Sequence, residues 1–296
     1  AALIRALEAR LGPDPARPTP FGQRFDLIAG TSIGGILATA LSCRATGAAL
    51  QALLQRRGSS IFPPMRLRGL RKLLGRAPYD PQRLRSAICE LLPDAEQQLL
   101  GEHAPALLLT TVNWTTSKLQ LLGSRPTLGQ RDQLGLTLMD AMLATSAAPA
   151  HFPVHSFQHH RFVDGGLAAN APDLHALQCA QQMYPGAEVH MLSIGTANPL
   201  HGRDPSAVPG RGLMWAGPVI ELVTSAQEML AVQECAARMG THRYLRLNMP
   251  PSSAQQKQLD FDVADQTSTD LLLSLADDCL ASLQPADWHR LKAIVG

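Results

Sequence analysis

The sequence predicts an α/β fold, because short apolar runs alternate along the chain with longer stretches that carry apolar residues at helical spacing. This alternation is typical of strands packed between helices, so we expect a three-layer α/β/α sandwich around a mostly parallel sheet. Hydrophobic residues make up 45% and charged residues 17% of the 296 residues, which suits a large core and excludes a disordered chain. We find no internal repeat and expect a single domain over residues 1–296.

The strands are expected where apolar or alternating residues form short runs. Residues 25–29 and 106–114 are apolar runs, whereas 118–122 and 243–248 alternate apolar with polar side chains. Two further runs rich in β-formers lie at 161–163 and 188–194. These six segments are the candidate strands of the sheet.

The helices are expected where apolar residues recur three and four positions apart. In the first helix Leu3, Leu7 and Leu11 form one stripe, and Gly12 follows as a residue type that ends helices. The predicted helices are 1–11, 33–44, 48–55, 82–91, 138–145, 171–183, 213–239, 268–283 and 285–294. Residues 58–80 contain several prolines and glycines, so we expect an irregular excursion or lid there.

Charge and composition exclude several classes of function. The net charge of +2 gives no reason to expect nucleic acid as a partner, and aromatic residues are only 4%. The five cysteines are scattered, which predicts neither a disulfide framework nor a zinc site. We find no apolar run long enough to span a membrane and no export signal, so the expected location is the cytoplasm.

The basic residues are concentrated in one segment that includes the expected excursion. Its patch members are Arg56, Arg57, Arg66, Arg68, Arg71, Lys72 and Arg76. Leu67, Leu70, Leu73 and Leu74 have helical spacing among these charges. The segment is therefore either a solvated basic face or a surface that binds the membrane.

The strongest motif follows the first predicted strand. Gly30-Thr31-Ser32-Ile33-Gly34-Gly35 has the form G-x-S-x-G and leads into a predicted helix. A serine on such a strand-to-helix turn adopts strained backbone, and its hydroxyl is exposed at a helix N-terminus that favours negative charge. Ser32 is therefore the candidate nucleophile, and a glycine-rich turn or phosphate-binding loop is the alternative.

A candidate base lies further along the chain. Asp164 is followed by Gly165 and Gly166 at the end of a predicted strand, and glycines there allow another loop to approach closely. A carboxylate can accept the proton of a serine hydroxyl if burial raises its pKa. The alternative interpretation of Asp164 is a turn residue that caps its neighbours.

The two motifs together resemble the patatin-like phospholipases. G-T-S-I-G-G and D-G-G-L-x-x-N-x-P occur in the family's order, the segment 144–153 resembles the one that precedes the family's aspartate strand, and residues 193–196 match a later strand end. The resemblance implies a patatin-like fold, a dyad of nucleophile Ser32 and base Asp164, and hydrolysis of lipid esters through an acyl-enzyme. It implies no metal or organic cofactor, and it implies action on phospholipid at the inner membrane surface.

The resemblance also raises two expectations about the whole protein. The family carries a glycine-rich oxyanion segment before its first helix, and we expect that segment upstream of Ala1. The layout beyond residue 200 resembles bacterial members that include effectors of antiphage CBASS systems, which a cyclic nucleotide activates. A cyclic di- or oligonucleotide activator and a homo-oligomer are therefore further expectations.

Two alternatives to a dyad enzyme stay open. An α/β-hydrolase-type esterase would add a later histidine, such as His175, His190 or His242, to Ser32 and Asp164. A non-catalytic, nucleotide-binding homologue is the other alternative. The cluster of His151, His155, His159 and His160 lacks the ligand spacing of a zinc site and is interpreted as surface or edge-strand histidines.

Overall fold

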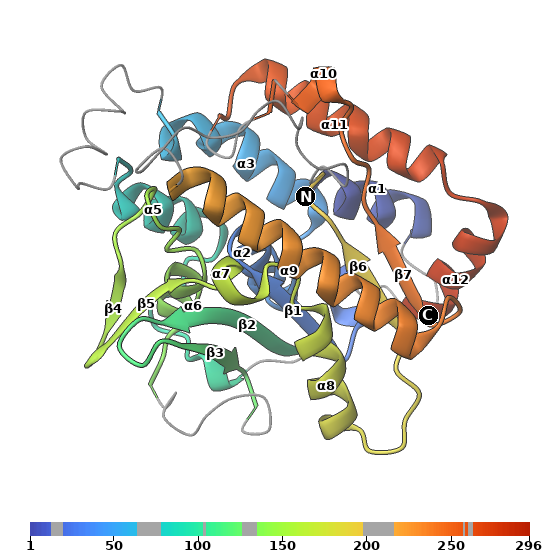
Figure 1. Cartoon of the computed structure of the whole chain (residues 1–296), viewed down its shortest axis with the longest axis horizontal. Helices are drawn as coiled ribbons and strands as arrows, with labels where there is room; N and C mark the ends of the chain where they lie inside the picture. The colour runs from blue at the N-terminus through green and yellow to red at the C-terminus, as the bar shows by residue number, and fades with distance from the viewer. Residues whose placement is uncertain are drawn as a thin grey trace.

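The computed structural model confirms the α/β class and describes residues 1–12, 20–63, 78–102, 105–125, 135–197, 216–256, 258–259 and 263–296 (Figure 1). The strands are β1 (Leu27–Thr31), β2 (Ala106–Asn113), β3 (Lys118–Gly123), β4 (His155–Phe157), β5 (His160–Asp164), β6 (Met191–Ile194) and β7 (Tyr244–Leu247). The α-helices are α1 (Ala2–Leu11), α2 (Ile33–Ser42), α3 (Gly47–Ile61), α5 (Pro81–Leu91), α6 (Leu138–Thr145), α7 (Gly166–Ala169), α8 (Asp173–Met183), α9 (Ala216–Met239), α10 (Ser253–Gln256), α11 (Gln266–Ala281) and α12 (Pro285–Val295). Short 3-10 turns lie at Phe21–Arg24 and Leu100–Glu102.

The strands form a five-stranded sheet and a two-stranded sheet. The expected parallel pairing holds for β1 with β2 and for β6 with β7. The pairs β2–β3, β2–β5 and β4–β5 are antiparallel, so antiparallel pairs accompany the parallel ones in the five-stranded sheet. For β2–β3 and β4–β5 the physical reason is that a turn of a few residues joins the two strands, and such short connections permit only antiparallel pairing.

Strand β2 lies at the centre of the fold and is buried on both faces. Leu107 and Leu109 pack with α2 and α6 on one face, while Ala106 and Leu108 pack towards α8 on the other. This alternation follows from the two-residue period of a strand and produces the three layers expected from the sequence. A further apolar cluster joins α1, α2, β6, β7, α11 and α12.

Residues 58–80 are not irregular throughout, which corrects one expectation. Helix α3 continues to Ile61 instead of ending near residue 55. Thr46 caps its first turn by accepting a hydrogen bond from the Ala49 N–H, and Gly58 lies against Ala264, where a Cβ would be 2.9 Å from the Ala264 Cβ. Close packing therefore favours a residue without a Cβ at this position of the helix. The remainder of the expected excursion, residues 64–77, lies outside the described residues.

The spacing of apolar residues in the sequence does not predict two short elements near the site. Strand β4 has three residues and helix α7 has four, which is too few for a repeat to be visible. The predicted helix at 171–183 begins instead at Asp173, after Pro172. No helix in the described ranges combines the length and apolar character that a membrane crossing needs.

Candidate active site

Ser32 occupies a strained turn between β1 and α2. Its φ of 55° and ψ of −128° are rare for a residue with a side chain. The turn is closed so tightly that a Cβ on Gly30 would stand 2.2 Å from the carbonyl oxygen of Gly34. The motif therefore forms the sharp strand-to-helix turn that the sequence predicts, with the serine at its apex.

Asp164 ends β5 and is only 5% exposed. Its Oδ2 accepts a hydrogen bond of 2.6 Å from the Ser32 hydroxyl, and its Oδ1 accepts one of 2.7 Å from the Gly166 N–H. The two candidate residues, 132 positions apart, are thus in direct contact. Burial raises the pKa of Asp164 to about 6, although the bonds from Ser32 and Gly166 lower it in part.

One segment holds both residues in place. The Ser32 N–H donates to Thr145 Oγ1 at 2.9 Å, and Thr145 Oγ1 donates in turn to the Thr110 carbonyl at 2.6 Å. The Gly165 N–H donates to the Thr145 carbonyl at 3.2 Å, and the Asp164 N–H donates to the Ala147 carbonyl at 3.0 Å. The end of α6 therefore fixes the separation of the serine turn from the aspartate turn.

The other predicted turn residues surround this pair in different ways. The Thr31 hydroxyl donates to the Ala169 carbonyl at 2.7 Å, and Ile33 is 38% exposed at the start of α2. Gly35 faces the Thr145 side chain, whereas Gly34 faces open space. A Cβ on Gly165 would lie 2.2 Å from the Thr110 carbonyl oxygen, so the turn after Asp164 requires a glycine there.

The histidines named as alternatives lie elsewhere among the described residues. Ser32 Oγ donates to Asp164, and the Asp164 carboxylate also accepts from the Gly166 N–H. Among the described residues, no histidine takes part in these hydrogen bonds. His190 lies 3.7 Å from Glu188, His242 lies near Gly240, and burial lowers the pKa of His175. The structure thus gives no support to a histidine triad in the part of the chain that it describes.

The histidine cluster is divided among several partners. His155 Nε2 lies 3.3 Å from Asp140 Oδ1, and His160 Nδ1 lies 3.3 Å from the Asn113 amide nitrogen. The His151 ring stacks on Tyr79, and His159 is exposed. In the described ranges, no group of three or more His, Cys, Asp or Glu side chains is placed to hold a metal ion.

The basic patch is only partly within the described residues. Arg56 and Arg57 both form ion pairs of 2.6 Å with Glu90, so their charges are shared with a carboxylate on α5. Arg66, Arg68, Arg71, Lys72 and Arg76 lie outside the described residues.

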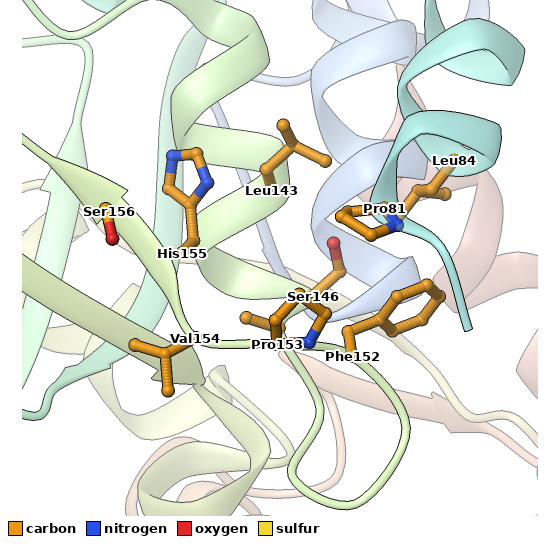
Figure 2. A pocket seen from close by; sticks show the side chains of 10 residues that line it. Pro81, Leu84, Leu143, Ser146, Phe152, Pro153, Val154, His155 and Ser156 are labelled. Atoms are coloured by element: carbon orange, nitrogen blue, oxygen red, sulfur yellow. The ribbon is translucent and has the colours of Figure 1, made fainter. Parts of the chain in front are cut away.

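A cleft of about 260 Å³ adjoins the segment that holds the dyad (Figure 2). Its lining residues are Pro81, Leu84, Leu143, Ser146, Ala147, Phe152, Pro153, Val154, His155 and Ser156. Most of these side chains are apolar, and Figure 2 shows His155 and Ser156 on the side opposite Pro81 and Leu84. Ala147 lines the cleft, and its carbonyl also accepts the hydrogen bond from the Asp164 N–H, so this residue contacts both the cleft and the dyad.

Several residues at the site have no signal in the sequence. Thr145 ends the predicted helix 138–145 and lies in the segment that the family resemblance marks, but its own role carries no signal, because its two hydroxyl bonds depend on the packing of α6 against β2. Asn170, in the predicted turn motif, donates to Glu228 on α9 at 2.9 Å. Glu228 lies 58 positions away, within a helix whose polar residues are not distinguished by periodicity.

The fold and the site define a class of enzyme, since a strained serine bonded to a buried aspartate is a feature suited to ester hydrolysis. The family model of the patatin-like phospholipases matches residues 1–177, and the chain belongs to this family of ester-hydrolysing enzymes. It is 31% identical to a cGAMP-activated phospholipase of Pseudomonas aeruginosa over 88% of this chain and 78% of that protein. Proteins with the same description from Vibrio cholerae and Escherichia coli are each 30% identical, covering 81% and 94% of this chain and 74% and 83% of their own lengths.

Proposed function

We propose that the chain is a phospholipase that cleaves carboxylic ester bonds with Ser32 as nucleophile and Asp164 as general base. The observation that carries this assignment is the hydrogen bond of 2.6 Å from the Ser32 hydroxyl to Asp164 Oδ2, made from a strained turn. With a pKa of about 6, Asp164 is ionised near neutral pH and is a stronger base than an ordinary exposed carboxylate.

The first half of the proposed reaction forms an acyl-enzyme. Ser32 Oγ attacks the ester carbonyl carbon as its proton moves to Asp164 Oδ2, which gives a tetrahedral intermediate with a negative oxygen. Helix α2 begins at Ile33, directly after the nucleophile, and the amide groups at a helix N-terminus stabilise such a charge. The intermediate collapses, the carbon–oxygen bond to the alcohol breaks, and the leaving lysophospholipid takes the proton from Asp164.

The second half restores the enzyme. Asp164 accepts a proton from water as the water oxygen attacks the acyl-enzyme carbonyl. Collapse releases the fatty acid, and the proton on Asp164 returns to Ser32 Oγ. The same pair of residues thus serves both halves, and no metal or organic cofactor takes part in the proposal.

We place an acyl chain of the substrate in the apolar cleft beside the dyad. The cleft is lined mostly by apolar side chains, and Ala147 contributes to both the cleft and the Asp164 bond. Burying a methylene group of an acyl chain is worth about 0.8 kcal/mol, so such a lining favours longer chains.

We further propose that a cyclic nucleotide switches the enzyme on, as in antiphage defence. The support is that three relatives, each similar to this chain over at least 81% of it, are described as cGAMP-activated phospholipases. The proposal places the enzyme at the cytoplasmic surface of the inner membrane and allows self-association. Residues 1–296 would form one catalytic domain.

The dyad is tested with a fluorophosphonate probe that labels activated serines. The wild-type chain should be labelled at Ser32, Ser32→Ala should lose the label, and Asp164→Asn should be labelled far more slowly. Equal labelling of Ser32→Ala would show that another residue is the nucleophile. A wild-type chain that binds cGAMP but is never labelled would support the non-catalytic alternative.

The activator is tested separately on vesicles of bacterial phospholipid. We expect cGAMP to raise the release of free fatty acid, and we expect Ser32→Ala to release none with or without it. Equal release without any added nucleotide would contradict the proposed switch while leaving the dyad intact.

A further inference from the structure

Two neighbouring side chains of α9 hold the short helix that follows the candidate base. Gln227 Nε2 donates to the Leu167 carbonyl at 2.7 Å, and Glu228 Oε2 accepts from Asn170 Nδ2 at 2.9 Å. Leu167 lies in α7, which starts two residues after Asp164, and Asn170 directly follows its last residue. Figure 1 shows α9 crossing the molecule with α7 beside it. The turn that carries the base is therefore fastened from outside by α9.

Glu228 also connects this helix to the two-stranded sheet. Its Oε1 forms an ion pair of 2.6 Å with Arg246 Nη2 on β7, and both side chains are largely buried, at 10% and 17% exposure. Arg246 Nη1 donates to Ser193 Oγ at 2.7 Å. The carboxylate thus bridges α7 and β7, and because it is buried its removal leaves charged and polar groups unpaired.

The network continues to the start of α8. Asp173 Oδ2 accepts bonds of 2.5 Å from both the Ser193 hydroxyl and the Tyr244 hydroxyl. Burial raises the pKa of Tyr244 further above its usual range, so the phenol stays a donor. The segment from Asp164 to Asp173 is therefore held at its far end by β6 and β7 as well as by α9.

Glu228 also determines which way the Asn170 amide faces. An ionised carboxylate can only accept hydrogen bonds, so the Asn170 amide nitrogen must point to Glu228 and its carbonyl oxygen must point away. That oxygen and Asp164 Oδ1 are each 3.1 Å from the position a Cβ on Gly166 would occupy. The orientation imposed by Glu228 therefore turns the Asn170 carbonyl oxygen towards Gly166, the residue whose N–H donates to Asp164 Oδ1.

We propose that Glu228 is a positioning residue for the Ser32–Asp164 pair, acting through Asn170 and anchored by Arg246. This inference rests on the proposed function. Glu228, Arg246 and Ser193 lie beyond residues 1–177, the part matched by the family model. The part of the chain that follows the family match thus becomes a component of the catalytic apparatus.

The test compares Glu228→Gln with Glu234→Gln in the full chain. Glu234 lies on the same helix and forms an exposed pair with Arg238, so its variant is the matched control. Turnover of a soluble short-chain ester is measured across pH, with saturating cGAMP present throughout. We expect Glu228→Gln to lower kcat by about 10- to 100-fold with little change in KM and to move the acidic limb of the pH profile. Glu234→Gln should match the wild type.

A second variant keeps the inference testable if Glu228→Gln does not fold. Asn170→Ala preserves the Glu228–Arg246 ion pair but removes the bond that links Glu228 to the end of α7. It should lower kcat and move the pH profile in the same way as Glu228→Gln. The double variant of Asn170→Ala and Glu228→Gln, where it folds, should lower kcat little further than either single variant. Folded Asn170→Ala with wild-type kcat and pH profile would overturn the inference. A wild-type chain without Ser32-dependent turnover would instead overturn the proposed function.

Discussion

The hydroxyl oxygen of Thr145 accepts a hydrogen bond of 2.9 Å from the backbone N–H of Ser32. Thr145 is the last residue of the neighbouring helix α6. The same hydroxyl donates to the Thr110 carbonyl at 2.6 Å, so it links the serine turn to the central strand. Thr145 itself is fully buried. The strained backbone of Ser32 is therefore supported by one buried hydroxyl.

Replacing this hydroxyl should damage both stability and turnover. Thr145→Val keeps the shape but leaves the Ser32 N–H without its acceptor, which costs about 1–3 kcal/mol when a donor is buried. We expect a lower melting temperature and a fall in kcat, measured by thermal unfolding and by ester turnover. Thr145→Ser, which retains the hydroxyl, is the control. Equal behaviour of the two variants would show that the hydroxyl is dispensable.

The pH dependence of turnover should follow Asp164. Because the base must be ionised and its pKa is about 6, kcat/KM on a soluble ester should fall as pH drops through about 6 and level off above it. The measurement is a pH–rate profile with a control for unfolding at each pH. A limb near the ordinary carboxylate value of 3.8 would contradict the assignment.

The same raised pKa has a consequence for stability. The folded chain binds the Asp164 proton more tightly than the unfolded chain, so the stability from that proton is present below about 3.8 and is lost as pH rises through about 6. At pH 8 the ionised carboxylate therefore destabilises the fold, by an upper bound of about 3 kcal/mol. We expect Asp164→Asn to be inactive yet to unfold at the same or a higher temperature at pH 8. A large loss of stability would show that the charge itself is needed for folding.

The glycines of the serine turn should differ sharply in their tolerance to substitution. A Cβ on Gly30 would overlap the Gly34 carbonyl oxygen, whereas one on Gly34 would meet nothing within 4 Å. Gly30→Ala should therefore lose about 1–3 kcal/mol or more, or fail to fold. Gly34→Ala should fold normally, because alanine favours a helix over glycine by about 1 kcal/mol. Denaturant unfolding of both variants decides this, and equal stabilities would contradict it.

The serine turn could be predicted because its determinants are local. The whole motif, with its strand, its glycines, its serine and its helix, lies within residues 27–42, so one short window of sequence contains it. Asp164 is predicted as the base from its two following glycines and from the order of the motifs in the family that the sequence resembles. These features need no knowledge of how distant segments pack.

The supporting contacts could not be predicted for the opposite reason. Thr145 and Glu228 reach the site only because α6 and α9 pack beside it, and their residue types are ordinary for helices. The last turns of α3, which ends at Ile61, include Gly58, and Gly58 packs against Ala264, more than 200 positions away. Antiparallel pairing of β5 with β2 likewise joins segments about 50 positions apart, such as Thr111 and Asp164, and no local pattern marks it.

The apolar cleft gives the last prediction, which concerns substrate choice. Val154 lines the cleft and is 44% exposed, so a larger side chain there fills the space without entering the core. We expect Val154→Trp to lower kcat/KM for a long-chain ester by about 10-fold, because apolar surface of the acyl chain is no longer buried. Turnover of an acetate ester should stay within about twofold of the wild type, since that acyl group is too short to reach the filled space. Leu272→Trp, at an exposed position of α11, is the matched control. An unchanged preference across chain lengths in folded Val154→Trp would place the acyl chain elsewhere while leaving the dyad assignment intact.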